Sequence, residues 1–224
     1  MQEGKVFYLI AGPNGSGKTT FAKHIINHQD VIFLNADKIA ADMKISNIGA
    51  ARILLKDFLP RALGSGHSFA LETTLSGTGD LNIIKMAKNH EYKIVFIFTF
   101  LASAKQSIER VAHRVRDGGH NVASDDIMRR YEKSLNNFAK ICPFADVWQL
   151  FYNGGMGEIQ NVASGTQSLV NVMHTGYYDL FIKQCNDAFN GRLCHFSDIG
   201  ADASVRSTQK VMTWFNNFIV SRQK

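Results

Sequence analysis

The chain is poor in cysteine and has no long hydrophobic run. Its three cysteines, Cys142, Cys185 and Cys194, lack the spacing of a metal site, so we expect them to be reduced and packed. The longest apolar run, Ile94–Ala102, is interrupted by Thr99 and is far too short to span a bilayer. The N-terminus has no basic segment leading into an apolar one, as a secretory signal would. We therefore expect no membrane association and a cytoplasmic location.

The bulk composition is that of an ordinary globular protein, with 45% hydrophobic and 20% charged residues. A length of 224 residues suffices for one α/β domain with an appendage. The formal net charge of +6 is compatible with nucleic acid, a membrane surface or small anionic ligands. Because the basic residues are spread along the chain, small anionic ligands are favoured, and nucleic acid is the second choice.

Apolar runs alternate with helical periodicity, which predicts an α/β fold with a parallel sheet flanked by helices. The expected strands are Val6–Ala11, Val31–Asn35, Ser68–Leu75, Tyr92–Leu101 and Asp146–Tyr152. The expected helices are Lys18–His28, Ile48–Leu63, Asp80–His90, Ser103–Arg116 and Asp125–Ile141. Pro60 is expected to kink or shorten the second helix. We place a core at residues 1–165, with a lid near 103–141, and a helical C-terminal extension at 166–224.

The end of the chain is harder to interpret than its first 152 residues. The stretch "IQNVASG", residues 159–165, predicts a short strand after a glycine-rich corner. Two further helices are expected near Tyr177–Phe189 and Ser207–Ser221. The role of the extension is open at this stage.

The stretch "GPNGSGKTT", residues 12–20, fits the pattern G-x-x-x-x-G-K-[ST] between a strand and a helix. In this Walker A loop, or P-loop, backbone N–H groups surround nucleotide phosphates and the lysine reaches the terminal phosphates. The threonine hydroxyl, here that of Thr19, binds Mg²⁺. We therefore expect ATP and Mg²⁺ as cofactors. The ATP-binding residues would be Gly12, Pro13, Asn14, Gly15, Ser16, Gly17, Lys18, Thr19 and Thr20.

Two carboxylates follow or interrupt neighbouring apolar runs, and parallel sheets bind ligands at the carboxyl ends of their strands. Asp37 follows the second run, where it is either a helix N-cap or a base that deprotonates an attacking hydroxyl. Glu72 lies within the third run, where it either serves the site or makes a buried structural hydrogen bond. Thr74 adds a hydroxyl beside Glu72 and is a candidate substrate contact.

Residues 108–138 predict two basic helices joined by a glycine hinge. On the first helix, Arg110 and Arg114 lie four residues apart, opposite the apolar stripe. Gly118 and Gly119 form the hinge, and His120 lies at its tip as a candidate substrate contact. Such a hinge would let the helices close over a triphosphate, with guanidinium groups stabilising the charge of the transferred phosphoryl group. The alternative is two solvated helix surfaces.

The second helix is expected to begin at a Ser124 cap, with Asp125 and Asp126 in its first turn. Its buried stripe would be Ile127, Tyr131, Leu135 and Phe138. This stripe leaves Arg129 pointing outward and Arg130 at the edge, so Arg130 is the better candidate to face a cleft.

Over residues 5–165 the sequence resembles the zeta-toxin-like P-loop kinases, including their shorter chromosomal relatives. The resemblance rests on "AGPNGSGKTTFA", "LNADKIA", "ALETTLSG", "RVRDGGHNV", "IMRRYEKSLNNF" and "DVWQLFYN" in that order. It implies a nucleotide-kinase-like core that transfers the ATP γ-phosphate to the 3′-hydroxyl of UDP-N-acetylglucosamine. A nucleotide-sugar substrate and an antitoxin or other protein partner are implied as well. Residues 166–224 have no counterpart in the short relatives.

The resemblance also implies roles for individual residues. Lys18 and Thr19 would hold phosphate and Mg²⁺, Asp37 would be the catalytic base, and Glu72 would lie near acceptor or metal. The catalytic lid arginines would be Arg114 and Arg130, with Arg110 and Arg116 as alternatives.

Two other functions remain open. A polynucleotide kinase, or a kinase of another nucleotide, would use the same loop, and the former would bind nucleic acid with strong salt dependence. A non-catalytic ATP-binding regulatory module would bind ATP and phosphorylate no acceptor.

Overall fold

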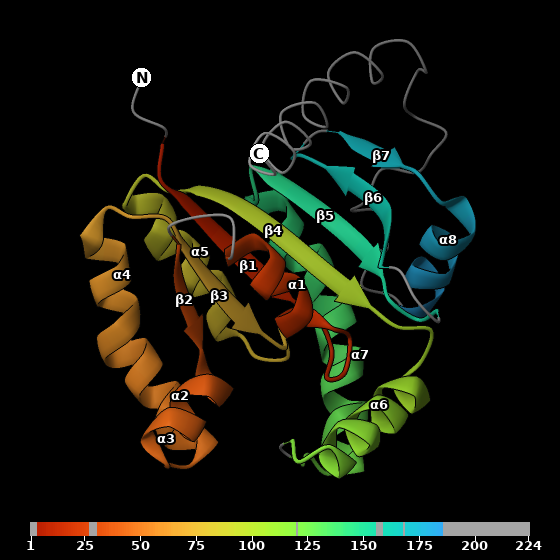
Figure 1. Ribbon diagram of the computed structural model, residues 1–224. Coiled ribbons are helices and arrows are strands. Elements are labelled where there is room, and N and C mark those ends of the chain that lie inside the picture. The colour runs from red at the N-terminus through yellow and green to blue at the C-terminus, as the bar shows by residue number, and fades with distance from the viewer. Residues whose placement is uncertain (1–3, 27–30, 120, 156–158, 168, 186–224) are drawn as a thin grey trace.

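The computed structural model describes residues 4–26, 31–119, 121–155, 159–167 and 169–185, and these residues contain a seven-stranded sheet (Figure 1). The strand order is β2-β3-β1-β4-β5-β6-β7. The first five strands pair in parallel, and β6 and β7 add in antiparallel fashion at one edge. The strands are β1 (Val6–Ala11), β2 (Ile32–Asn35), β3 (Phe69–Thr73), β4 (Lys93–Phe100), β5 (Val147–Tyr152), β6 (Gln160–Gly165) and β7 (Val170–Val172).

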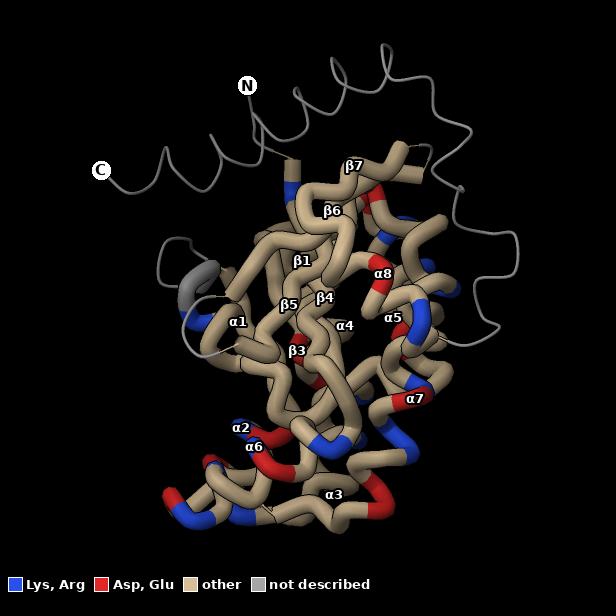
Figure 2. The backbone as a smooth tube through the Cα atoms, turned by 90° about the vertical axis from the view of Figure 1, so that its right-hand side faces the viewer, with Lys and Arg blue, Asp and Glu red and all other residues tan. Residues whose placement is uncertain are grey.

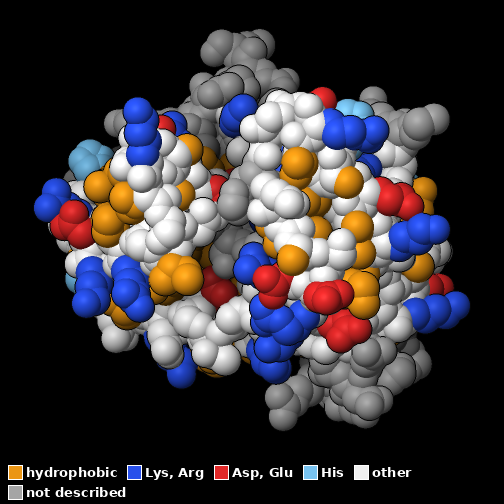
Figure 3. All heavy atoms as spheres, turned by 90° about the horizontal axis from the view of Figure 1, so that it is seen from below, with side chains coloured by type: hydrophobic (Ala, Val, Ile, Leu, Met, Phe, Trp, Pro, Cys, Tyr) orange, Lys and Arg blue, Asp and Glu red, His pale blue; other side chains and the backbone are white. Residues whose placement is uncertain are grey.

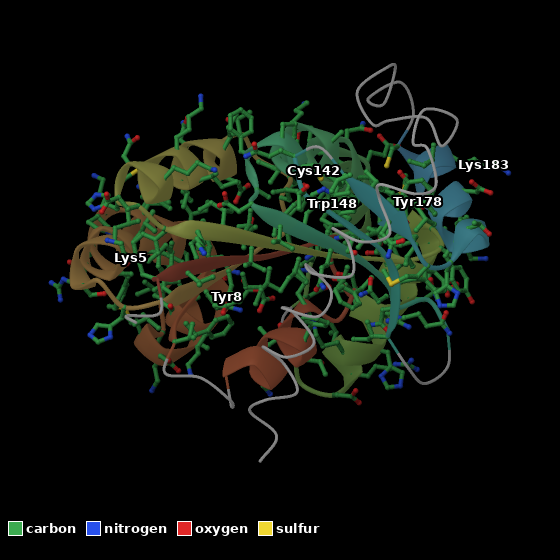
Figure 4. The ribbon with its side chains drawn as sticks, turned by 90° about the horizontal axis from the view of Figure 1, so that it is seen from above. Lys5, Tyr8, Cys142, Trp148, Tyr178 and Lys183 are labelled. Carbon is green, nitrogen blue, oxygen red and sulfur yellow. The ribbon has the colours of Figure 1, made fainter. Side chains whose placement is uncertain are left out.

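Helices cover both faces of the sheet. The described α-helices are α1 (Lys18–Ile26), α2 (Ala36–Met43), α3 (Asn47–Ile53), α4 (Leu59–Ser65), α5 (Gly79–Asn89), α6 (Ala104–Arg116), α7 (Ser124–Ile141) and α8 (Thr175–Gln184). Apolar residues of α4, α5, α7 and α8 pack on one face, and residues of α1 pack on the other. Figure 4 shows these two layers along the sheet edge, with Cys142 in the first layer.

The main core is aromatic and lies under α7 and α8. Phe138 of α7 packs edge-on against Trp148 of β5 and Phe181 of α8, with ring centroids 5.6 and 5.0 Å apart. On the other face, the buried Tyr8 belongs to a smaller cluster that Phe21 of α1 completes. The stripe expected on α7 is confirmed, because its four members are all buried.

The predicted parallel sheet is confirmed, and each predicted strand matches an observed strand to within two residues at either end. The strand predicted at 159–165 is β6. Pro60 lies in a helical stretch that contains a π-turn, Leu54–Phe58, where Leu59 N–H bonds the Leu54 carbonyl. This turn ends two residues before the proline, which cannot donate a backbone hydrogen bond.

Four local points differ from the predictions or lie partly outside the described residues. Helix α2 was not predicted. The cap expected at Ser124 was wrong, because Ala123 is the N-cap of α7 and Ser124 is its first residue. The helix predicted near 177–189 corresponds to α8 as far as residue 184. The helix expected at 207–221 lies outside the described residues. Strand β7, which lies in the predicted C-terminal extension, pairs with β6 and so continues the core sheet.

Candidate active site

The carboxyl ends of β1 to β5 all lie at one edge of the sheet, at the lower side of Figure 1. The P-loop follows β1, Asp37 follows β2, and Glu72 lies near the end of β3. Figure 2 shows that charged residues concentrate over the helices at this edge, while the strands are largely uncharged. Seen from below, the surface is hollowed between the two sides of the molecule, with acidic and basic side chains around the hollow (Figure 3).

The P-loop backbone requires glycine at defined positions. Gly12 has a φ of +145°, and a Cβ there would lie 2.1 Å from the Thr99 carbonyl oxygen. Gly17 has a φ of +88°, and a Cβ there would lie 2.3 Å from Nδ2 of Asn153. Left-handed backbone and close packing therefore exclude larger residues at both positions.

Three polar residues from distant parts of the chain hold the loop. Ser16 shares a buried 2.7 Å hydrogen bond with the Thr99 hydroxyl of β4, and Asn153 Nδ2 donates to the Ser16 carbonyl at 2.9 Å. The buried Ser107 hydroxyl of α6 donates to the Asn14 carbonyl. This role of Thr99, Ser107 and Asn153 was not predicted from the sequence. The one available signal was that Thr99 is a polar residue in an apolar run.

Lys18 is the cation of the site. Its Nζ donates to the Pro13 carbonyl at 2.8 Å, and the residue is buried. Burial lowers the pKa of Lys18 to about 8, although the nearby carboxylates of Glu72 and Asp37 favour its charged form. The Arg114 guanidinium also lowers this pKa. The structure thus brings Lys18, Glu72, Asp37 and Arg114 into one electrostatic neighbourhood, as a phosphate-transfer site requires.

Glu72 is held through both of its carboxylate oxygens. Thr19 Oγ1 donates to Oε1 at 2.9 Å, and Asn35 Nδ2 donates to Oε2 at 2.7 Å. A hydroxyl beside a carboxylate is a donor set that fits Mg²⁺, which is commonly bound through one or two carboxylates and substrate phosphates. The described residues contain no cluster of three His, Cys, Asp or Glu side chains suited to a metal ion. Thr19 and Glu72 are therefore the residues that would hold Mg²⁺ together with the nucleotide.

Asp37 is exposed and differs from Glu72 in its contacts. Its Oδ1 accepts a 2.8 Å hydrogen bond from Asn47 Nδ2 of α3, and its Oδ2 makes no hydrogen bond to the described residues. The helix-cap interpretation of Asp37 was wrong, because Asn35 caps α2 by accepting from the Lys38 N–H at 2.9 Å. Asp37 therefore keeps a carboxylate oxygen that can accept a proton from an incoming hydroxyl.

The arginines predicted for a lid lie in different surroundings. Arg110 packs on the P-loop, and its guanidinium lies 3.5 Å from the carbonyl oxygens of Gly15 and Gly155. Arg114 is exposed near Lys18, and the exposed Arg116 ends α6. Arg130 of α7 is half-buried near Asp126, whose pKa is lowered by a 2.6 Å bond from Arg129 and by the charges of both arginines. His120 lies outside the described residues.

Thr74 lies in the turn between β3 and α5, where its hydroxyl shares a 2.9 Å hydrogen bond with that of Ser76. Since β3 neighbours β1, this turn lies at the same sheet edge as the P-loop. The remaining candidate, Thr20, is exposed in the first turn of α1.

The parallel sheet, the glycine-dependent loop after β1 and the buried Lys18 define a P-loop nucleotide-binding protein. The chain belongs to the AAA domain family, whose model matches residues 7–140. A protein of Haemophilus influenzae (strain ATCC 51907 / DSM 11121 / KW20 / Rd), named only as uncharacterized, is 31% identical over 140 residues. The match covers 58% of this chain and 94% of that protein.

Two solved structures have a similar fold. One comes from the PezAT chromosomal toxin-antitoxin system of Streptococcus pneumoniae, with a TM-score of 0.60 and 12% identity over 97% of this chain and 88% of that chain. The other is the AvrRxo1-ORF1:AvrRxo1-ORF2 complex with sulphate ions, with a TM-score of 0.58 and 16% identity. The match covers 78% of this chain and 62% of that chain. This protein therefore spans less than two thirds of the length of that chain. The same complex has also been solved with ATP.

In the part of the chain that the structure describes, no helix is both long and apolar enough to span a bilayer.

Proposed function

We propose that this protein is an ATP-dependent kinase that phosphorylates a hydroxyl group of a nucleotide sugar. The observation that carries the proposal is that the two carboxylates near Lys18 make different hydrogen bonds. Glu72 is bonded through both oxygens, one of them to the predicted Mg²⁺-binding hydroxyl of Thr19. Asp37 is exposed and keeps one oxygen without a bond to the described residues. A kinase needs both: one carboxylate at the metal and one base at the acceptor.

Each residue of the site then has its own role in the proposed reaction. Lys18 would bring its charge to the terminal phosphates, and Thr19 and Glu72 would hold Mg²⁺, which neutralises phosphate charge when bound. Asp37 orients the acceptor hydroxyl and takes its proton. The acceptor oxygen forms a bond to the γ-phosphorus while the bond from that phosphorus to the β–γ bridging oxygen breaks, and ADP leaves. Arg114 and Arg130 are the arginines we assign to stabilising the transferred phosphoryl group.

The acceptor we propose is UDP-N-acetylglucosamine, phosphorylated on its 3′-hydroxyl. This choice rests on the resemblance of the sequence motifs to the zeta-toxin-like kinases, and the fold likeness to PezAT is compatible with it. The formal net charge of +6 suits an anionic diphosphate sugar. The same likeness supports a protein partner of the antitoxin kind.

The test is incubation of the protein with ATP, Mg²⁺ and a panel of acceptors. The panel contains UDP-N-acetylglucosamine, UDP-glucose, NAD, free nucleosides and RNA 5′ ends. We expect a singly phosphorylated UDP-N-acetylglucosamine, identified by mass spectrometry, whose new phosphate maps to the 3′-hydroxyl by phosphorus NMR.

The other outcomes separate the alternatives. Transfer to RNA 5′ ends and to no sugar nucleotide would identify a polynucleotide kinase. ATP binding with no acceptor phosphorylated would identify a regulatory module and overturn the kinase proposal.

A further inference from the structure

The turn from Thr74 to Thr78, between β3 and α5, contains a residue other than glycine with a left-handed backbone. Leu75 is fully buried yet has a φ of +56°, in the left-handed region that favours glycine. Strained residues of this kind persist only where the surroundings fix them, and they cluster at functional sites. We call residues 74–78 the β3–α5 turn.

Several contacts between neighbouring residues hold this turn in place. The Leu75 N–H donates to Thr73 Oγ1 at 3.1 Å, and Asp80 is buried at the start of α5. Burial raises the pKa of Asp80, and the Thr73 side chain lowers it. Thr74 and Ser76 are joined through their hydroxyls at 2.9 Å. The turn therefore has a defined conformation, and it carries the hydroxyls of Thr74 and Ser76 at the edge of the sheet.

One residue from a distant helix closes the turn. Asn137 of α7 donates from Nδ2 to the carbonyl oxygens of Leu75 at 2.9 Å and Gly77 at 3.1 Å. Asn137 lies seven residues after Arg130, two helical turns along, so both residues occupy the same side of α7. The helix that carries a proposed lid arginine is thus bonded to the turn.

The turn also has a fixed place relative to the P-loop. In the sheet register Ala11, the last residue of β1, pairs with Thr73, the last residue of β3. The two segments that follow these residues, the P-loop and the β3–α5 turn, therefore leave the sheet side by side. An acceptor bound against the turn would lie next to the phosphates that the P-loop binds.

We infer that the β3–α5 turn positions a polyhydroxylated acceptor through Thr74 and Ser76, and that Asn137 is the positioning residue that holds the turn in its strained shape. This inference rests on the proposed kinase function and adds an acceptor-side role to it. Loss of the two amide hydrogen bonds frees Leu75 to leave the left-handed region, which moves the hydroxyls on either side of it.

The test compares Asn137→Ala with Asn136→Ala in the full-length protein. Asn136 is the same residue type on the same helix, and its buried Oδ1 makes no hydrogen bond within the described residues. Hydrogen–deuterium exchange should rise in peptides covering residues 74–78 for Asn137→Ala and stay unchanged there for Asn136→Ala. With UDP-N-acetylglucosamine as the probe, Asn137→Ala should raise the acceptor KM about tenfold and leave the ATP KM unchanged.

Each outcome decides a separate claim. Unchanged exchange at residues 74–78 overturns the positioning role of Asn137, whatever the acceptor is. Raised exchange with equal changes in both KM values overturns the assignment of the turn to the acceptor. If the wild-type protein does not phosphorylate the probe, the proposed acceptor fails and the exchange result alone decides the role of Asn137.

Discussion

Thr19 Oγ1 donates a 2.9 Å hydrogen bond to Oε1 of Glu72, although the two residues are 53 positions apart in the sequence. This bond links the first residues of α1 to the end of β3 and places a carboxylate directly behind the predicted Mg²⁺ ligand. Asn35 holds the second oxygen of the same carboxylate at 2.7 Å, so Glu72 cannot turn away without losing both bonds.

The first prediction concerns this bond and the metal. Glu72→Gln removes the negative charge but keeps an oxygen that can accept from Thr19. We expect the Mg²⁺ concentration for half-maximal rate to rise at least about 10-fold, because Glu72 would hold Mg²⁺ with Thr19 and loss of even an outer partner of a metal ligand typically costs about 10- to 100-fold. The measurement is the initial rate against free Mg²⁺ at saturating ATP. An unchanged Mg²⁺ dependence, with a full loss of rate at every concentration, would instead make Glu72 an acceptor contact.

The second prediction uses the pKa of Lys18, which burial lowers to about 8. Nucleotide phosphates favour the charged lysine, so ATP binding should raise this pKa and take up a proton wherever the free protein has lost it. With full charging in the complex, the uptake should be roughly 0.1 proton at pH 7 and roughly 0.8 at pH 8.5, and ATP affinity should fall above pH 8. Calorimetry in two buffers of different ionisation enthalpy measures the uptake.

The result at pH 7 is the internal control for that experiment. A binding enthalpy that does not depend on the buffer at pH 8.5 would show that Lys18 is already charged in the free protein or does not meet the phosphates.

The third prediction concerns the arginines of α6 and α7. Arg114→Ala and Arg130→Ala should lower kcat by more than they weaken ATP binding, because these charges matter most when phosphate charge is redistributed. Arg129→Ala is the matched control, since the exposed Arg129 pairs with Asp126 at 2.6 Å. Steady-state kinetics and ATP titration provide the two quantities. Small and equal losses in kcat and affinity would make Arg114 and Arg130 solvated surface residues.

The sheet could be predicted because buried parallel strands appear as nearly continuous apolar runs, as in Val6–Ala11. The P-loop could be predicted because glycine spacing is imposed by backbone geometry at Gly12 and Gly17. Helix α2 was missed because it has only 8 residues and follows β2 directly, since its capping residue, Asn35, is also the last residue of that strand.

The polar residues that support the site could not be predicted. Asn153 bonds Ser16 across 137 positions, and Asn137 bonds Leu75 across 62. An asparagine in such a place has no local pattern, because its partners are backbone carbonyls that only the folded chain brings near. The distinction between Asp37 and Glu72 likewise depends on hydrogen-bond partners, not on spacing.

The fourth prediction tests the central claim, that Asp37 is the base for a hydroxyl acceptor. Asp37→Asn keeps the shape and an oxygen for the Asn47 bond but cannot accept the proton. Asp42→Asn, a similar change on the exposed side of the same helix, is the control. ATP affinity should be unchanged in both variants.

The most direct measurement is single-turnover transfer from ATP to UDP-N-acetylglucosamine by the wild-type protein, Asp37→Asn and Asp42→Asn. We expect transfer that is slower by at least about 100-fold in Asp37→Asn and unchanged in Asp42→Asn, with ATP bound equally by all three. Transfer by Asp37→Asn at the wild-type rate would show that Asp37 is not the base.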